Sequence, residues 1–276
     1  MIADTIVTDL DDTLLDIKGE ISDFTLGVLR QCLEKGIRVI PASGRAQASM
    51  EPYVRRLNTG LPYIACNGAQ LVNADHSLIE NLTLPLHTAR EICVYLQERD
   101  FYVQAYRGDS FFYAKECAPS LSYKRSSKLN GEAVGDLLTF LTFGTPKLLC
   151  ISEPERIAEL YPKISARFEG QAVFSISHPS FLEVEPLEGS KGAALKRLAA
   201  RIGIDPKTTY VFGDSLNDLS MLAFTEHSVA MGNARDEVKK AARYICGPNS
   251  EDGLARFVLS RLLNGIPEGG QHHDQH

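Results

Sequence analysis

Near its start the chain reads Thr5-Ile6-Val7-Thr8-Asp9-Leu10-Asp11-Asp12-Thr13-Leu14-Leu15, with three carboxylates directly after a short apolar run. The apolar run has the composition of a buried strand. Asp9 and Asp11 are two positions apart, so in extended backbone their side chains point to the same side. Carboxylates this close repel one another unless a cation lies nearby, and ligands bind at the carboxyl ends of strands in open α/β sheets. The stretch indicates a nucleophile beside a general acid/base, with an acidic turn before a helix as the alternative.

Strands and helices alternate along the chain after this stretch. After it we expect a helix over 22–35, a strand over 37–40, a helix over 46–57 and a strand over 63–66. The pattern returns with helices over about 191–202, 217–224 and 253–263 and strands over 209–212, 228–231 and 244–246. Parallel strands need crossover helices, so the order predicts a doubly wound, mostly parallel Rossmann-like core sheet.

Residues 84–187 depart from this alternation. Strand-like runs cover 101–106, 111–113, 147–151 and 181–184, with one helix opening on a capping box at 88–91 and another over 154–168. Many strands beside few helices predict an inserted α+β domain with an antiparallel sheet. We therefore expect a core made of residues 1–83 and 188–276, interrupted by this insert.

A second acidic cluster, Gly213-Asp214-Ser215-Leu216-Asn217-Asp218, also follows an apolar strand. Asp214 can complete an oxygen shell begun by Asp9, supported by Asn217 or Asp218, and magnesium prefers such ligands together with water and phosphate. A helix N-cap is the alternative. Two acidic strand ends in one chain favour the metal site.

Two further segments fit a phosphate group. Ser43 and Gly44 follow the second predicted strand, where a hydroxyl and a backbone amide can bind phosphate oxygens, although a plain strand-to-helix turn has the same composition. Lys191 stands at the start of a helix, where the helix dipole disfavours a cation. Neutralisation of phosphate or aspartate explains that position, and an ordinary surface lysine is the alternative.

Composition narrows the classes of function. The 276 residues carry a formal net charge of −6, with 44% hydrophobic and 23% charged residues, as in ordinary soluble globular proteins. No basic stripe indicates nucleic-acid binding, and no apolar run reaches the ~20 residues of a membrane span. The six cysteines are scattered, which favours reduced thiols and, with no signal-peptide pattern, a cytoplasmic protein. The histidine-containing tail over 269–276 reads as a disordered end.

Taken together, the motifs resemble the haloacid dehalogenase-like superfamily of phosphohydrolases, and within it the Cof-type family, which carries a large cap between its second and third motifs. The four superfamily motifs occur in order along nearly the whole chain, and two further segments are typical of the family. The matching residues are Asp9 with Asp11, Ser43, Lys191, Asp214 with Asp218, Asn67-Gly68-Ala69 and Met231-Gly232-Asn233-Ala234. Any one motif is weak, and the ordered set is specific.

Three positions depart from the Cof-type pattern. Asp12 stands where glycine is usual, Ser43 replaces the commoner threonine, and Ser215 replaces a frequent glycine. No catalytic group is lost through these changes. They bear on the subfamily rather than on the activity.

The resemblance implies a magnesium-dependent phosphatase that works through an aspartyl phosphate on Asp9, with Asp11 as general acid/base. It implies that Lys191, Ser43 and Gly44 bind the phosphate. It places the metal between the Asp9 side chain, the Asp11 backbone carbonyl and Asp214. Asn217 and Asp218 would lie next to these ligands without binding the metal directly. The implied partner is a small phosphorylated metabolite such as a sugar phosphate, nucleotide or cofactor phosphate, and neither nucleic acid nor membrane. The oligomeric state does not follow from the sequence.

The resemblance also implies that residues 84–187 form a cap that closes over the site and sets substrate specificity. Polar or aromatic candidates in this region receive no individual role from the sequence. They are Arg107, Tyr113, Lys124, Arg125 and His178.

Three other functions are alternatives to a phosphatase. A phosphomutase shares the aspartyl-phosphate chemistry, but relatives of beta-phosphoglucomutase carry the cap between the first and second motifs, where this chain has only about thirty residues. Phosphomannomutases use the later insertion point and stay open as an alternative. A non-catalytic binding protein would be expected to lack one of the three aspartates, and a response-regulator-like phosphoacceptor would not need the insert.

Overall fold

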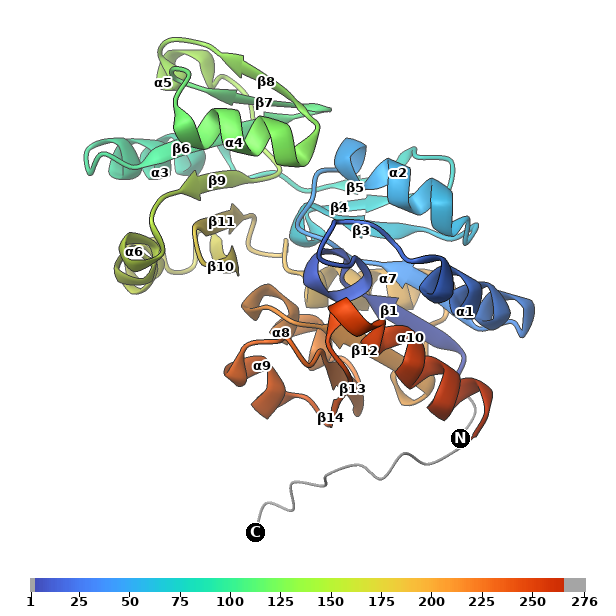
Figure 1. Cartoon of the computed structure of the whole chain (residues 1–276). Helices are drawn as coiled ribbons and strands as arrows, with labels where there is room; N and C mark the ends of the chain where they lie inside the picture. Colours follow the sequence, from blue (N-terminus) through green and yellow to red (C-terminus); the bar gives the residue numbers. More distant parts are fainter. Residues whose placement is uncertain (1–2, 266–276) are drawn as a thin grey trace.

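The computed structural model describes residues 3–265, and its core is a parallel five-stranded sheet in the order β14-β13-β12-β1-β2 (Figure 1). All four pairings are parallel, and β1 at the start of the chain lies between β2 and β12. The strands are β1 (Thr5–Thr8), β2 (Arg38–Pro41), β12 (Thr209–Gly213), β13 (His227–Ala230) and β14 (Tyr244–Ile245). The predicted doubly wound parallel core is confirmed.

Helices cover both faces of this sheet. On one face α1 (Asp23–Glu34) contacts α2 (Gln47–Leu57) and α10 (Gly253–Val258). On the other, α7 (Lys191–Ile202) contacts α8 (Leu219–Leu222), which contacts α9 (Asp236–Ala241) (Figure 1). The predicted start of α1 is confirmed, since the Ser22 hydroxyl accepts a hydrogen bond from the Thr25 N–H at 3.0 Å. The helices predicted over 22–35, 46–57 and about 191–202 correspond to α1, α2 and α7, whereas α9 was not predicted.

The third predicted strand continues differently from the expectation. β3 (Tyr63–Ala65) pairs antiparallel with β4 (Gln70–Val72), which pairs with β5 (Leu78–Asn81). Within residues 3–265, a single parallel bridge, Ala42 to Ile64, joins this small sheet to the core. The β4–β5 hairpin was not predicted, because its strands are short and partly polar and give little periodic signal.

The insert forms a second sheet, in the order β10-β11-β9-β6-β7-β8, which we call the cap (upper left in Figure 1). Its pairings are antiparallel except for β7 with β8. The strands are β6 (Tyr102–Arg107), β7 (Ser110–Tyr113), β8 (Asn130–Ala133), β9 (Leu148–Ile151), β10 (Val173–His178) and β11 (Phe181–Glu185). The helices are α3 (Leu86–Gln97), α4 (Ala118–Ser127), α5 (Leu137–Phe140) and α6 (Pro154–Arg167).

The two faces of the cap sheet differ in chemistry. Strand alternation places Leu182 and Val184 in an apolar cluster that also contains residues of α3 and α6. Glu183 and Glu185 alternate with them and therefore point to the opposite face, toward the core. Both glutamates are buried there, so the cap presents ionisable groups to the core.

The helix that opens the cap begins earlier than the sequence indicated. α3 begins at Leu86, after Pro85 as N-cap residue, and Thr88 lies buried within its first turn. The predicted capping box at 88–91 is wrong, because Thr88 lies inside the helix and Pro85 is its N-cap residue. Within residues 3–265 no helix combines the length and apolar character that a bilayer span requires. The histidine-containing tail lies outside the described residues.

Candidate active site

The predicted site residues meet at the carboxyl edge of the parallel sheet. Asp9 directly follows β1, Ser43 follows β2 and Asp214 follows β12, while Lys191 is the first residue of α7. A turn of irregular backbone follows Asp9, in which Asp11 is extended and Asp12 is left-handed, with φ of 56°. Since left-handed backbone favours glycine, this explains why glycine is usual at position 12. The Asn233 side chain donates to the Asp12 carbonyl at 2.8 Å and holds the turn in place.

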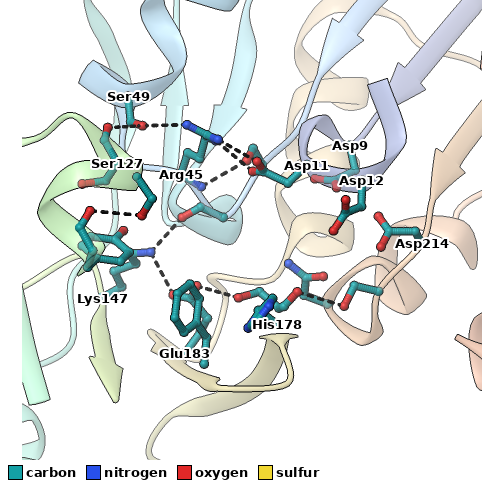
Figure 2. Close-up of a pocket in the computed structure, with 18 of the residues that line it drawn as sticks. Asp9, Asp11, Asp12, Arg45, Ser49, Ser127, Lys147, His178, Glu183 and Asp214 are labelled. Carbon is teal, nitrogen blue, oxygen red and sulfur yellow. Dashed lines mark hydrogen bonds and ion pairs between the residues drawn. The ribbon is translucent and has the colours of Figure 1, made fainter. Parts of the chain in front are cut away.

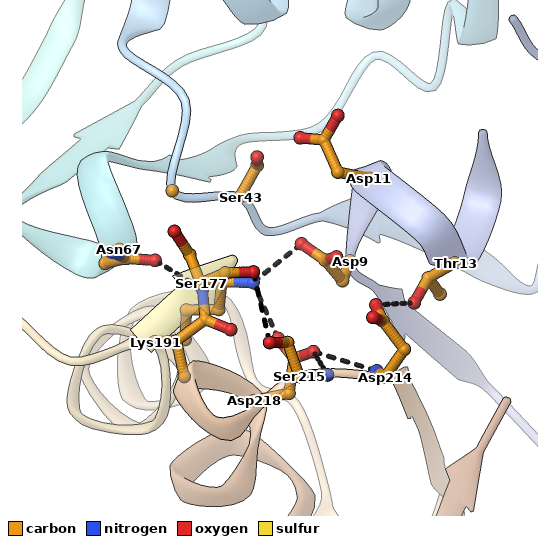
Figure 3. A network of polar contacts seen from close by, with 12 residues as sticks. Asp9, Asp11, Thr13, Ser43, Asn67, Ser177, Lys191, Asp214, Ser215 and Asp218 are labelled. Carbon is orange, nitrogen blue, oxygen red and sulfur yellow. Dashed lines mark hydrogen bonds and ion pairs between the residues drawn. The ribbon is translucent and has the colours of Figure 1, made fainter. Parts of the chain in front are cut away.

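Lys191 is the buried centre of the site (Figure 3). Its Nζ lies 2.6 Å from Asp9 Oδ1 and 2.6 Å from Asp218 Oδ1. Burial alone would lower the pKa of Lys191, and the two carboxylates reverse that effect and raise it above its ordinary value. The two ion pairs account for a cation at the start of a helix.

Asp9, Asp214 and Asp218 offer carboxylate oxygens that lie within 4.8 Å of one another. Asp218 has its oxygens engaged: Oδ1 pairs with Lys191, and Oδ2 accepts from the N–H groups of Asp214 and Ser215 at 2.9 and 3.0 Å. Asp214 Oδ1 accepts from the Thr13 hydroxyl at 2.8 Å. Asp9 and Asp214 are therefore the carboxylates best placed for a cation, whereas both oxygens of Asp218 already have partners.

The electrostatics of this cluster fit a divalent cation. Burial raises the pKa of Asp214 to about 7, and the charge of Asp218 adds to the effect. Burial also raises the pKa of Asp9, opposed by Lys191 and reinforced by the neighbouring aspartates. Carboxylates whose charged forms are disfavoured in this way are stabilised by a bound magnesium ion. The donor set, hard oxygens from a few carboxylates, is the one magnesium prefers.

Asp11 is held by a partner that the sequence analysis did not identify. Arg45 Nε lies 2.8 Å from Asp11 Oδ2, and Arg45 Nη2 lies 2.7 Å from Oδ1, a bidentate pair (Figure 2). Burial lowers the pKa of Arg45, and the hydrogen bonds and charge of Asp11 outweigh this and raise it. The only sequence signal for Arg45 was its place directly after Ser43 and Gly44.

Residues 43–45 form a tight loop, which we call the phosphate loop. The Arg45 N–H donates to Ser43 Oγ at 3.1 Å, and the Ser43 N–H donates to the Ile64 carbonyl at 3.0 Å. A Cβ added to Gly44 would lie 2.9 Å from Asn67 Oδ1, so a larger residue would displace that side chain. The loop therefore places a buried hydroxyl beside Asp9 and Asp11 at the edge of the sheet (Figure 3).

Asn217 turns toward the interface between core and cap. Its Nδ2 donates to Asn67 Oδ1 at 2.9 Å, and Asn67 Nδ2 donates to Glu185 Oε1 at 2.5 Å. Asn217 Oδ1 and Glu185 Oε2 are buried atoms without a hydrogen-bond partner among residues 3–265. A chain of side chains thus connects the second acidic cluster to the end of β11, where the chain leaves the cap.

A cavity of about 390 Å³ lies between core and cap and is lined by residues of both (Figure 2). Asp9, Asp11 and Ser43 form its core side, and Tyr123, Lys147, His178 and Glu183 belong to its cap side. Of the five cap candidates that the sequence offered, only His178 lines it. Lys147 and Glu183 were missed, because a charged residue in a strand carries no sign of which face it joins until the sheet is assembled.

Comparisons with known proteins place the chain in a family. The model of the haloacid dehalogenase-like hydrolases matches residues 6–258, so the chain belongs to this family of enzymes. It is 28% identical to the 5-amino-6-(5-phospho-D-ribitylamino)uracil phosphatase YwtE of Bacillus subtilis, covering 94% of this chain and 98% of that protein. It is also 28% identical to the HMP-PP phosphatase of Serratia proteamaculans, covering 84% of each chain. A haloacid dehalogenase-like hydrolase from Bacteroides thetaiotaomicron has a similar structure, with a TM-score of 0.81, 30% identity, and coverage of 93% of this chain and 98% of that one.

Glu185 gives a testable effect of pH on stability. Burial raises the pKa of Glu185 to about 8, and the charge of Glu183 adds to it. A carboxyl with a raised folded-state pKa stabilises the protein below its unfolded pKa, and this contribution is lost as the pH rises through the folded value. We expect Glu185→Gln to gain thermal stability relative to wild type between about pH 5 and about pH 8.5. Thermal melts in EDTA at several pH values measure the difference.

Glu188→Gln is the matched control, because Glu188 is exposed three residues further along the chain. Its melting temperature is expected to follow wild type at every pH. A constant difference between Glu185→Gln and wild type across this range would contradict the assignment.

Proposed function

We propose that the protein is a magnesium-dependent phosphatase that hydrolyses a small phosphorylated metabolite through an aspartyl phosphate on Asp9. The observation that carries the proposal is the pair Asp9 and Asp214 at the core side of the cavity, with the buried Lys191 ammonium group 2.6 Å from Asp9 Oδ1. A buried carboxylate held by a lysine, next to a second carboxylate suited to a metal, matches the needs of a nucleophile in phosphoryl transfer.

In the first step, an oxygen of Asp9 attacks phosphorus, and the bond from phosphorus to the alcohol oxygen breaks. Lys191 Nζ lies 2.6 Å from Asp9 Oδ1 and fixes the orientation of the Asp9 carboxylate. Ser43, the Gly44 amide and Lys191 stabilise the phosphate oxygens, whose charge is spread in the transition state. Positioning and electrostatics, rather than covalent chemistry elsewhere, supply most of the rate.

Asp11 moves the proton in both steps. It gives a proton to the departing alcohol oxygen, and then takes one from the water that attacks the aspartyl phosphate and restores Asp9. A bidentate pair with Arg45 needs an ionised Asp11, whereas donation needs a protonated one. The pair therefore belongs to the interval in which phosphate is on Asp9 and Asp11 is ionised, when Arg45 orients Asp11 toward the attacking water. It loosens once Asp11 has taken the proton of that water.

The Asp9 and Asp214 carboxylates and the Asp11 backbone carbonyl would hold the magnesium ion. When bound there, the ion supplies positive charge that offsets the phosphate and orients it for attack. Asp218 supports this arrangement by holding Lys191 and the backbone at Asp214 and Ser215.

The cavity limits the substrate to a small molecule. A volume of about 390 Å³ fits a metabolite with its phosphate at the core side and the remainder against the cap. The phosphatases among the relatives, named for a ribitylaminouracil phosphate and for HMP-PP, support a substrate of this size. The cap, which closes the cavity, selects among sugar phosphates, nucleotides and cofactor phosphates.

The test is phosphate release by purified protein across a panel of phosphorylated metabolites, with magnesium and with EDTA. We expect release from at least one metabolite, lost in EDTA and restored when magnesium is added back. Release that is equal in EDTA would overturn the role of the metal. Product that retains radiolabelled phosphate would indicate a mutase instead.

A further inference from the structure

The side chain of one cap residue, Lys147, extends to the core beside the cavity. Lys147, directly before β9, is 1% exposed, and its Nζ donates to Glu183 Oε2 and to the Gly44 carbonyl, each at 2.8 Å (Figure 2). Its ammonium group also lies 4.7 Å from the centre of the Tyr106 ring. Glu183 is fixed in turn by the Ser177 hydroxyl at 2.9 Å. The ammonium group of Lys147 is thus engaged on several sides, and the only one of these partners that belongs to the core is a backbone oxygen of the phosphate loop.

That backbone oxygen controls the phosphate-binding hydroxyl. The Gly44 carbonyl and the Arg45 N–H belong to one planar peptide unit, so fixing the carbonyl fixes the direction of the N–H. The Arg45 N–H donates to Ser43 Oγ at 3.1 Å. With that acceptor position occupied, the Ser43 O–H is left to donate elsewhere, and in the proposed reaction it donates to phosphate. Lys147 therefore acts on Ser43 through one rigid peptide.

Other hydrogen bonds also join core and cap without touching this peptide, and two of them come from serine hydroxyls that line the cavity. The Ser49 hydroxyl donates to the Ser127 carbonyl at 2.8 Å, and the Ser215 hydroxyl donates to the Ser177 carbonyl at 3.1 Å. Ser49 accepts a hydrogen bond from the Arg45 side chain of the phosphate loop, at 3.2 Å. The Ser49 and Ser215 hydrogen bonds hold the cap against the core, whereas the Lys147 bond also orients the phosphate loop.

We propose that Lys147 is a positioning residue, whose bond to the Gly44 carbonyl completes the Ser43 phosphate site when the cap is closed. The inference rests on the proposed function, in which Ser43 binds the transferred phosphate. A substrate that keeps the cap from closing then meets an incomplete phosphate site. Selection by the cap is in this way coupled to the rate of the chemical step rather than to binding alone.

A double-mutant cycle tests this coupling. With p-nitrophenyl phosphate and magnesium, we expect Ser43→Ala to lower kcat about 10²-fold, as for loss of one donor to a developing charge. We expect Lys147→Met to lower kcat about tenfold through misplacement of that donor. In the Ser43→Ala background the Lys147→Met change should then have little further effect. The same cycle is measured on the affinity for inorganic phosphate by calorimetry, which needs no turnover.

Two variants keep the cycle interpretable. Lys147→Met with Glu183→Gln avoids leaving a buried carboxylate without its partner, and it should show the same loss and the same dependence on Ser43. Ser49→Ala removes a core-to-cap hydrogen bond of equal length, and its smaller effect should add to that of Ser43→Ala. Additive effects of Lys147→Met and Ser43→Ala, or an unchanged Lys147→Met protein, would overturn the inference. A coupled phosphate affinity in a wild type that releases no phosphate would overturn the proposed function and leave this inference standing.

Discussion

Replacing Asp9 with asparagine is expected to lower phosphate release by at least about 10⁴-fold, because an amide cannot form the acyl phosphate that the proposed reaction requires. We expect no neighbouring carboxylate to replace it, because Asp214 accepts from Thr13, Asp218 accepts from Lys191 and two backbone N–H groups, and Asp11 is paired with Arg45. The expected loss is in kcat, and it is measured as phosphate release from the best substrate found in the metabolite panel.

The folded structure should survive this change. Asparagine has the shape of aspartate and can still accept from Lys191 through its oxygen, while Asp218 retains its own bond to Lys191. Because burial raises the pKa of Asp9, a neutral side chain there should not lower the melting temperature. Asp23→Asn, at a side chain 98% exposed, serves as the control and should keep full activity.

Trapping of the intermediate makes the test specific. Wild type quenched in acid after reaction with labelled substrate should carry phosphate on Asp9, and Asp9→Asn should carry none. Residual activity above about a hundredth of wild type would mean that the nucleophile lies elsewhere.

The parts of the site that sequence predicted are those that a local pattern places. Asp9 and Asp214 each follow an apolar strand, and parallel strands bring their carboxyl ends to one edge, so their proximity followed from the fold class. The core strands and α1 were predicted for the same reason, since hydrophobic periodicity and caps act over a few residues.

The parts that were missed depend on contacts between distant segments. Arg45 pairs with Asp11 from 34 positions away, and Lys147 binds Gly44 from 103 positions away. Strand alternation alone shows that Glu183 and Glu185 share a face, but not that this face meets the core. The short β4–β5 hairpin is fixed by pairing with β3 rather than by its own composition. Such features appear only once the sheets are assembled.

Lys191→Met is expected to destabilise the protein by about 3–5 kcal/mol in EDTA, the usual cost of leaving buried charges without their partner. The ammonium group neutralises Asp9 and Asp218 at once, each at 2.6 Å, and all three side chains are buried. Methionine fills the volume of the lysine stem, so the loss reports the charge rather than a cavity. Denaturant unfolding measures the change in the free energy of unfolding, and kcat should fall by at least about 10²-fold in the same protein.

A second substitution separates stability from catalysis. Asp218→Asn in the Lys191→Met background removes one of the two carboxylates left without a partner, and its oxygen can still accept from the N–H groups of Asp214 and Ser215. We expect the double variant to recover a large part of the lost stability, because one buried charge is gone. Activity should not return, since no ammonium group remains beside Asp9 to fix its rotation and to bind phosphate. Recovery of phosphate release together with stability would show that Lys191 acts only as a structural counter-charge, and the catalytic role proposed for it would be wrong.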